Sequence, residues 1–181
     1  KDVLKDAFIY NESPEITEVI PDNGKLTGGT EISIQGCGFL PGAIVSFGKG
    51  TQALIGASST QVMSGNLIMA KTTPGKPGSV SVKVFNPDKQ RVILENAFTY
   101  NPLPTITRTT PNYGSSSGGT KIIIDGTGFM QGATVIIGEL PATTQVKSDT
   151  TIEATAPSLP QGVWDVRVVN PDTQEVVKSK G

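Results

Sequence analysis

The chain contains an internal repeat, which limits the possible folds more than any other feature of the sequence. Residues 14–48 and 104–138 are identical at 17 of 35 positions when each residue of the first copy is aligned with the residue 90 positions later. After a contraction of six residues the similarity resumes, because "GSVSVKVFNPD" at 78–88 aligns with "GVWDVRVVNPD" at 162–172. This pattern indicates two copies of one folding unit.

The ends of the two copies predict the domain boundaries. The first copy closes on "NAFTYN" at 96–101, and "DAFIYN" at 6–11 shows the same pattern before the first copy begins. The second copy stops before such a stretch. We therefore expect the last strand of a preceding unit, followed by two domains. The expected segments are 1–11 for that strand, 12–101 for domain 1 and 102–181 for domain 2, whose final strand is truncated.

Alternating apolar residues predict that both copies consist of β-strands. In "TEISIQG" and "TKIIIDG" isoleucine recurs at every second position, as one buried face of a strand requires. In 79–84 we expect the three valines to be buried while Ser81 and Lys83 face solvent. In 163–168 we expect Trp164 to be buried with the valines that share its face. Short strands joined by glycine- and proline-rich turns favour a two-sheet sandwich.

The charge and cysteine content exclude several classes of function. The chain has 15 basic and 16 acidic residues, and neither sign is concentrated in one segment, so no nucleic-acid partner is expected. No run of about 18 apolar residues occurs, so we predict no direct membrane insertion. Cys37 is the one cysteine, which leaves no internal disulfide and fits a cytosolic or a bacterial surface protein.

The glycine pairs beside the strands do not have the spacing of a phosphate-binding loop. In "GCGFLPG" at 36–42 and in its copy at 126–132, the third glycine comes one residue too late for a dinucleotide-binding fingerprint. An alternating strand pattern follows where that fingerprint needs a helix. Turns and bulges explain these glycines, and we expect Phe39 and Phe129 to be core residues.

A second short motif points towards catalysis without the residues that catalysis needs. The sequence "GSSSG" at 114–118 matches the G-x-S-x-G nucleophile motif, but the chain has no histidine to act as a base. The missing histidines and the single cysteine also leave no zinc site, and "DNG" at 22–24 lacks the other ligands of a calcium loop. We predict no enzyme activity, no catalytic residue, no cofactor and no metal site.

The one candidate for contact with a ligand is Tyr113. It lies in the "PNYG" turn, where the first copy has Asn23, and an aromatic residue on a turn is expected to be exposed. Trp164 alternates with valines, so we interpret it as a core residue rather than a platform for sugar rings.

The ordered set of motifs resembles the IPT/TIG domain. It comprises an opening P-x-I-T-x-x-x-P-x-x-G, then GGT, I-x-G-x-G-F, GA-x-V, V-x-N-P-D and a closing AF-x-Y. The resemblance covers nearly the whole chain twice, although the second copy lacks the closing AF-x-Y. It implies an all-β fold of tandem immunoglobulin-like β-sandwiches. Such domains occur in Rel-type transcription factors, receptor ectodomains, cyclodextrin-forming glucanotransferases and tandem arrays on bacterial surface proteins.

Near-zero charge and the lack of disulfides favour the bacterial arrays among these settings. The leading hypothesis is a non-catalytic segment of a larger bacterial cell-surface or secreted protein, whose repeats act as an extracellular spacer or adhesion scaffold. Neighbouring repeats of the same chain are its expected partners, together with a protein or glycan ligand. The alternative is an accessory carbohydrate-binding module of a polysaccharide-active enzyme, with Tyr113 as its aromatic contact.

The truncated second copy leads to one further hypothesis. Residues 3–10 are expected to form a strand without a place in the first copy, and the second copy is expected to lack a strand. A neighbouring molecule is therefore expected to donate this segment to the open edge by β-augmentation.

Overall fold

The computed structural model describes residues 10–49 and 55–179, and these form strands joined by turns. The chain divides into two compact units, Lys1–Tyr100 and Asn101–Gly181, here called unit 1 and unit 2. Both units are two-sheet β-sandwiches, which confirms the predicted all-β immunoglobulin-like fold. The hypothetical donor strand at 3–10 lies outside the described residues except for Tyr10. In the described ranges there is no helix long and apolar enough to cross a membrane.

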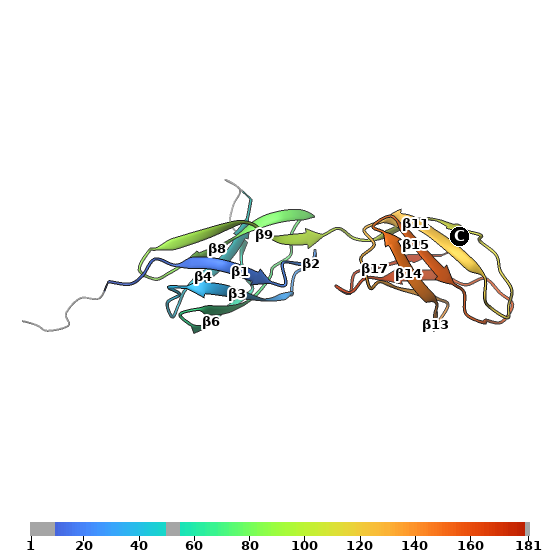
Figure 1. Cartoon of the computed structure of the whole chain (residues 1–181), viewed down its shortest axis with the longest axis horizontal. Coiled ribbons are helices and arrows are strands. Elements are labelled where there is room, and N and C mark those ends of the chain that lie inside the picture. Colours follow the sequence, from blue (N-terminus) through green and yellow to red (C-terminus); the bar gives the residue numbers. More distant parts are fainter. Residues whose placement is uncertain (1–9, 50–54, 180–181) are drawn as a thin grey trace, which may run out of the picture. The chain divides into compact units, whose positions relative to one another are not determined.

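Unit 1 contains a four-stranded and a five-stranded sheet (Figure 1). The first sheet has the order β1 (Glu15–Ile20), β3 (Glu31–Cys37), β7 (Leu67–Lys71) and β6 (Ser59–Ser64). The second sheet has the order β2 (Asn23–Lys25), β9 (Arg91–Asn101), β8 (Gly78–Phe85), β4 (Ile44–Gly48) and β5 (Ile55–Gly56).

Unit 2 repeats this arrangement with one strand fewer in the second sheet. Its first sheet has the order β10 (Thr105–Thr110), β11 (Lys121–Thr127), β15 (Thr151–Thr155) and β14 (Thr143–Ser148). Its second sheet has the order β13 (Leu140–Pro141), β12 (Thr134–Ile137), β16 (Val166–Val169) and β17 (Glu175–Lys178). The described residues thus include no counterpart of β2.

Each unit has its own hydrophobic core between its sheets. The alternating isoleucines of β3 and β11 supply its centre, since Ile32, Ile34 and Ile124 have no exposed surface. Phe39 and Phe129 are 2% and 4% exposed, which confirms that they are core residues.

Glycines are required where the first two strands in each unit's first sheet pair closely. At Gly36 an added Cβ would lie 1.9 Å from the carbonyl oxygen of Glu15, and at Gly126 it would lie 1.8 Å from that of Thr105. Both positions adjoin a bulge in the pairing of the opening strand. These glycines allow a close backbone approach, as expected of structural positions in a bulged strand.

The predicted exposure of Ser81 and Lys83 is wrong. Ser81 is 2% and Lys83 is 8% exposed, because β8 lies inside its sheet between β4 and β9. Side chains of the neighbouring strands shield the outward face of such a central strand more fully than a simple alternation suggests. The Ser81 hydroxyl also donates a hydrogen bond to the carboxylate of Glu95 on β9.

Candidate functional site: an apolar groove in unit 2

In unit 1 the closing half of β9 fills one end of the sandwich. Phe98 has no exposed surface and Tyr100 is 3% exposed, and their rings meet edge to face with centroids 5.1 Å apart. The Tyr100 hydroxyl donates a 2.8 Å hydrogen bond to the carbonyl oxygen of Thr73. Phe47 flanks Phe98 at a centroid distance of 5.9 Å. Because β9 lies between β2 and β8, this segment completes the sheet as well as the core.

The equivalent end of unit 2 is an open groove with a volume of about 870 Å³. This size falls within the roughly 300–1,000 Å³ typical of ligand-binding sites. Its floor belongs to the core of unit 2. The floor residues are Ile122, Ile137, Ala156, Leu159 and Val166. Ile137 aligns with Phe47, so the groove occupies the place that Phe98 and Tyr100 fill in unit 1.

Trp164 lines one side of the groove, and its predicted burial in the core is wrong. The side chain is 41% exposed and lies before β16, which begins at Val166. Its Nε1 donates a 3.0 Å hydrogen bond to the carbonyl oxygen of Pro160. Its ring packs so closely on Gly138 that an added Cβ would lie 2.9 Å from it. Trp164 is therefore held in a defined position while much of its surface faces solvent.

The exposure of Trp164 has a structural cause. Trp164 aligns with Val80, which is paired with Phe98 across β8 and β9. In the described part of unit 2, no strand takes the place of the closing half of β9. Residues 162–164 therefore have no strand partner among the described residues, and β16 starts at Val166, later than the sequence pattern predicts.

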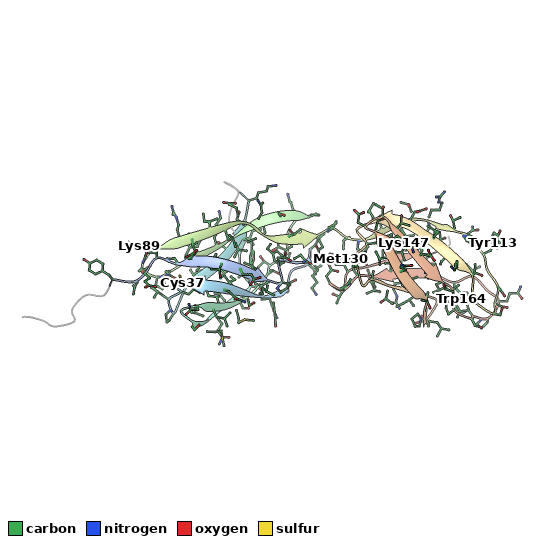
Figure 2. The ribbon with its side chains drawn as sticks, in the orientation of Figure 1. Cys37, Lys89, Tyr113, Met130, Lys147 and Trp164 are labelled. Carbon is green, nitrogen blue, oxygen red and sulfur yellow. The ribbon has the colours of Figure 1, made fainter. Side chains whose placement is uncertain are left out.

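Tyr113 lines the other side of the groove and is 81% exposed, as predicted. It aligns with Asn23 of β2, the strand that flanks β9 in unit 1. Figure 2 shows Tyr113 and Trp164 in the same half of unit 2. Trp164, which the sequence pattern assigned to the core, thus lines the same groove as the predicted candidate Tyr113.

The backbone on both sides of the groove has unused hydrogen-bonding capacity. Among the residues that the structure describes, no hydrogen bond engages the backbone N–H or C=O of Tyr113, Gly114, Val163 or Trp164. Val163 is 70% exposed. Backbone groups of this kind beside an apolar floor can pair with an extended chain.

Two polar side chains of the groove, those of Ser115 and Lys178, have structural partners. The hydroxyls of Ser115 and Ser117, from the "GSSSG" stretch, are 2.6 Å apart and hydrogen-bonded to each other. The Lys178 ammonium group donates to the carbonyl oxygen of Thr107. The described residues contain no cluster of side chains suited to hold a metal ion. The groove is thus equipped for apolar contact and backbone pairing.

A second repeated feature lies at the opposite end of each unit, in the Asn-Pro-Asp-x-Gln stretches at 86–90 and 170–174, here called the clamps. In unit 1 the Gln90 side-chain amide donates to the carbonyl oxygens of Asn11 and Glu12, each at 3.4 Å. The Asn11 amide in turn donates to Asp88 at 3.0 Å. The clamp therefore holds the segment that leads into unit 1.

The clamp of unit 2 makes the same bonds. Gln174 donates to the carbonyl oxygens of Asn101 and Pro102 at 3.2 and 3.3 Å. Asn101 donates to Asp172 at 3.0 Å. The asparagines of the two clamps, Asn86 and Asn170, each donate a 2.7 Å bond to the glycine carbonyl beside the core phenylalanine. The incoming segment of each unit is thus tied to its core turn.

Hydrogen bonds affect the acidity of one clamp residue. The side chain and backbone N–H of Gln90, together with the Asn11 amide, lower the pKa of Asp88 below its ordinary value. These donors stabilise the charged carboxylate. The clamp of unit 1 is therefore built around an ionised aspartate.

Comparison with known proteins identifies the family. A family model for the IPT/TIG domain matches residues 14–100 and again residues 104–180. The chain belongs to the IPT/TIG domain family. Fibrocystin-L of Mus musculus is 27% identical to it over 92% of this chain, and Plexin-A4 of Danio rerio is 29% identical over 86%. The chain spans 4% and 8% of the lengths of these two relatives.

Solved structures show the same fold. The full extracellular region of plexin A4 matches with a TM-score of 0.54 at 22% identity, over 91% of this chain and 15% of that one. At this identity the match establishes shared architecture. In both comparisons this pair of IPT/TIG domains matches a short segment of a much longer chain.

The sequence contained a signal for the exposed Trp164. The alignment at an offset of 84 placed Trp164 on Val80, whose strand partner in the first copy belongs to the closing AF-x-Y. In the described part of unit 2 no strand takes that place beside Trp164, which is 41% exposed. The interpretation from periodicity alone missed it, because periodicity describes one strand and takes no account of its neighbour.

Proposed function

We propose that this chain is a non-catalytic structural and interaction segment of a larger bacterial cell-surface or secreted protein, with its IPT/TIG domains acting as a spacer or adhesion scaffold. The observation that carries the proposal is the pair of clamps. Each unit fixes its incoming segment through the same set of hydrogen bonds, as units meant to work in series require. The small share of the relatives that this chain spans supports a segment of a longer protein.

The extracellular setting has separate support. One curated relative is a plexin, and the matching solved structure is an extracellular region. The bacterial setting rests on composition, since the chain has one cysteine and no internal disulfide. The two relatives named above come from mouse and zebrafish and do not contribute to this part of the proposal. Whether the scaffold engages a glycan is tested below with a panel of soluble polysaccharides.

Small-angle scattering tests the spacer role. The full chain is expected to give a narrow distribution of maximum dimensions, because the clamp leaves few freely rotating residues at the connection. Gln174→Ala removes two clamp bonds and is expected to broaden the distribution, whereas Gln145→Ala, an exposed glutamine on β14, leaves it unchanged. Two units that tumble independently in the unaltered chain would overturn the proposal.

The second candidate function is binding of a carbohydrate. It is favoured by the two exposed aromatic side chains of the groove, Tyr113 and Trp164, because aromatic faces suit apolar stacking with small amphipathic ligands. Affinity electrophoresis through a panel of soluble polysaccharides tests it. Retardation by one glycan, lost in both Tyr113→Ala and Trp164→Ala, supports this function, and equal mobility in every gel removes it.

A further inference from the structure

We propose that a cleft in unit 1, between β1 and the first half of β9, binds a lysine side chain that an extended segment of a protein partner presents. The cleft has a volume of about 560 Å³, which lies within the range typical of ligand-binding sites. It belongs to unit 1 alone. The proposal goes beyond the spacer function and does not depend on it.

Two irregular strands form the walls of this cleft. β1 is the edge strand of the first sheet and has a bulge between Ile16 and Glu18. The pairing of β9 with β8 is also interrupted, so that residues 95–97 have no partner in its register. Apolar side chains of both strands form the floor, namely Val19, Leu94 and Ala97. Such a floor suits the methylene stem of a lysine.

Three exposed carboxylates surround the apolar floor, those of Glu18, Asp22 and Glu95. Among the described residues, no lysine or arginine forms an ion pair with any of them. Asp22 and Glu95 accept hydrogen bonds from neutral side chains, whereas Glu18 has no such bond within the described ranges. A positive charge at the end of an apolar stem therefore matches both the carboxylates and the floor.

Unit 2 shows an ammonium group at the equivalent place. Its Lys178 donates a hydrogen bond to the carbonyl oxygen of Thr107, the bulged residue of β10. Thr17 is the bulged residue at the same position of β1, and Leu94 aligns with Lys178. Unit 1 thus repeats the bulge whose carbonyl oxygen binds a lysine in unit 2, but it has a leucine where that lysine would be.

The charges of the two copies differ in a consistent direction. The three carboxylates of the cleft align with Arg108, Asn112 and Ser179 in unit 2. The copy that supplies its own lysine therefore has none of these carboxylates, and the copy without the lysine has all three. An acidic composition does not explain the difference, because the chain has 15 basic and 16 acidic residues.

The position of the cleft favours an extended protein segment as the source of the lysine. β1 has an open edge, and such an edge can pair with the backbone of an incoming chain. Acidic side chains on an edge strand also discourage unwanted pairing with other strands. That protective role requires no apolar floor and predicts no affinity for lysine, so a binding experiment separates the two roles.

A titration followed by NMR chemical shifts tests the site directly. The probe is the peptide acetyl-Thr-Lys-Thr-amide, added to the full chain at low ionic strength because salt screens exposed charges. Saturable shifts are expected for the backbone amides of Leu94 and Ala97. The same peptide with an acetylated lysine keeps the stem but loses the charge, and it is expected to bind about tenfold more weakly. Equal affinity for the two peptides, or shifts that leave the cleft unaffected, would overturn the proposal.

Two charge variants of β1 distinguish the cleft from general attraction. Glu18→Gln removes a carboxylate of the cleft and is expected to weaken binding of the peptide about two- to fivefold. Glu15→Gln removes the same charge from the same strand outside the cleft, and its effect is expected to stay below about 1.5-fold. Both side chains are exposed, and the spectrum of each free variant verifies its fold. Equal affinities of the two variants would contradict the site.

A lysine placed within unit 1 gives an intramolecular test. Leu94→Lys copies the arrangement of unit 2, so the new ammonium group is expected to occupy the site and to abolish the saturable shifts. Ile93→Lys adds the same charge at the neighbouring exposed position of β9, outside the cleft, and is expected to retain them. Loss of binding in both variants, or in neither, would overturn the proposal. Equal affinity of the unaltered chain for spermidine would also overturn it, in favour of a small free amine. A failure of the spacer role in scattering changes none of these readouts.

Discussion

Aromatic residues at the same end of the two units have opposite environments. Phe98 and Tyr100 are buried in unit 1, whereas Tyr113 and Trp164 are exposed in unit 2. The difference does not come from hydrophobicity, since tryptophan and tyrosine both gain from burial. It comes from the partner strand. The exposure of Trp164 is thus decided by whether the closing half of β9 has a counterpart beside it among the described residues.

The first prediction, at the residue scale, concerns the acidity of Tyr100. Burial raises the pKa of Tyr100 above its ordinary value of 10.0. The folded state therefore favours the neutral phenol, so this contribution to stability is complete below about pH 10 and is lost as the pH rises through the folded pKa. In a chain with Tyr10→Phe and Tyr113→Phe, tyrosinate absorbance reports Tyr100 alone. Its titration midpoint is expected to be higher in the folded chain than in denaturant.

A matched variant separates the pKa from the hydrogen bond. Tyr100→Phe removes the bond to Thr73 and is expected to cost unit 1 about 0.5–1.5 kcal/mol at neutral pH. It also removes the alkaline loss of stability that Tyr100 causes. Identical midpoints for folded and unfolded Tyr100 would contradict the assignment.

At the scale of elements, the opening strand of each unit depends on one close backbone approach to its antiparallel neighbour. β3 lies closest to β1 at Gly36, and β11 lies closest to β10 at Gly126, next to a bulge in each case. The first glycine of each stretch that suggests a phosphate loop in the sequence allows this close pairing instead. Such a position tolerates no side chain because the obstacle is a backbone carbonyl rather than a movable side chain.

The second prediction is that Gly36→Ala destabilises unit 1 by about 1–3 kcal/mol or more, since the new Cβ overlaps the Glu15 carbonyl. Gly56→Ala is the control, because nothing lies within 4 Å of its added Cβ. The control is expected to change stability by less than about 1 kcal/mol. Calorimetric unfolding of the two variants measures both effects, and equal shifts would refute the steric explanation.

The whole molecule consists of two units with separate cores. Unit 1 closes its sheet with β9, while unit 2 leaves an open groove over part of its core. Since apolar burial supplies most of the stability of such small domains, the two units should differ in stability although they share a family and a fold.

The third prediction follows at this scale. Unit 2 is expected to unfold at a lower denaturant concentration than unit 1, by an amount of the order of one large apolar side chain, roughly 1.5–3 kcal/mol. Trp164 fluorescence follows unit 2, and circular dichroism follows the whole chain. The fluorescence transition should precede the end of the dichroism transition. A single transition in which both signals coincide would contradict two independent units.

The amino-acid sequence alone determined the repeat, the family, the β-sandwich and most of the core. These features depend on a spacing of residues that occurs in both copies. Isoleucines at every second position indicate a buried strand face, and glycines at fixed points indicate turns or a close backbone approach. Neither depends on distant parts of the chain, and the exposure of Tyr113 follows from its place on a turn. Tertiary structure decided what depends on neighbours in the sheet. Lys83 is covered because its strand has partners on both sides, and Trp164 is exposed because the described residues place no strand beside residues 162–164. Only the folded arrangement brings Tyr113 and Trp164 to one groove, since residues far apart in the chain meet there across a space whose shape no local pattern encodes.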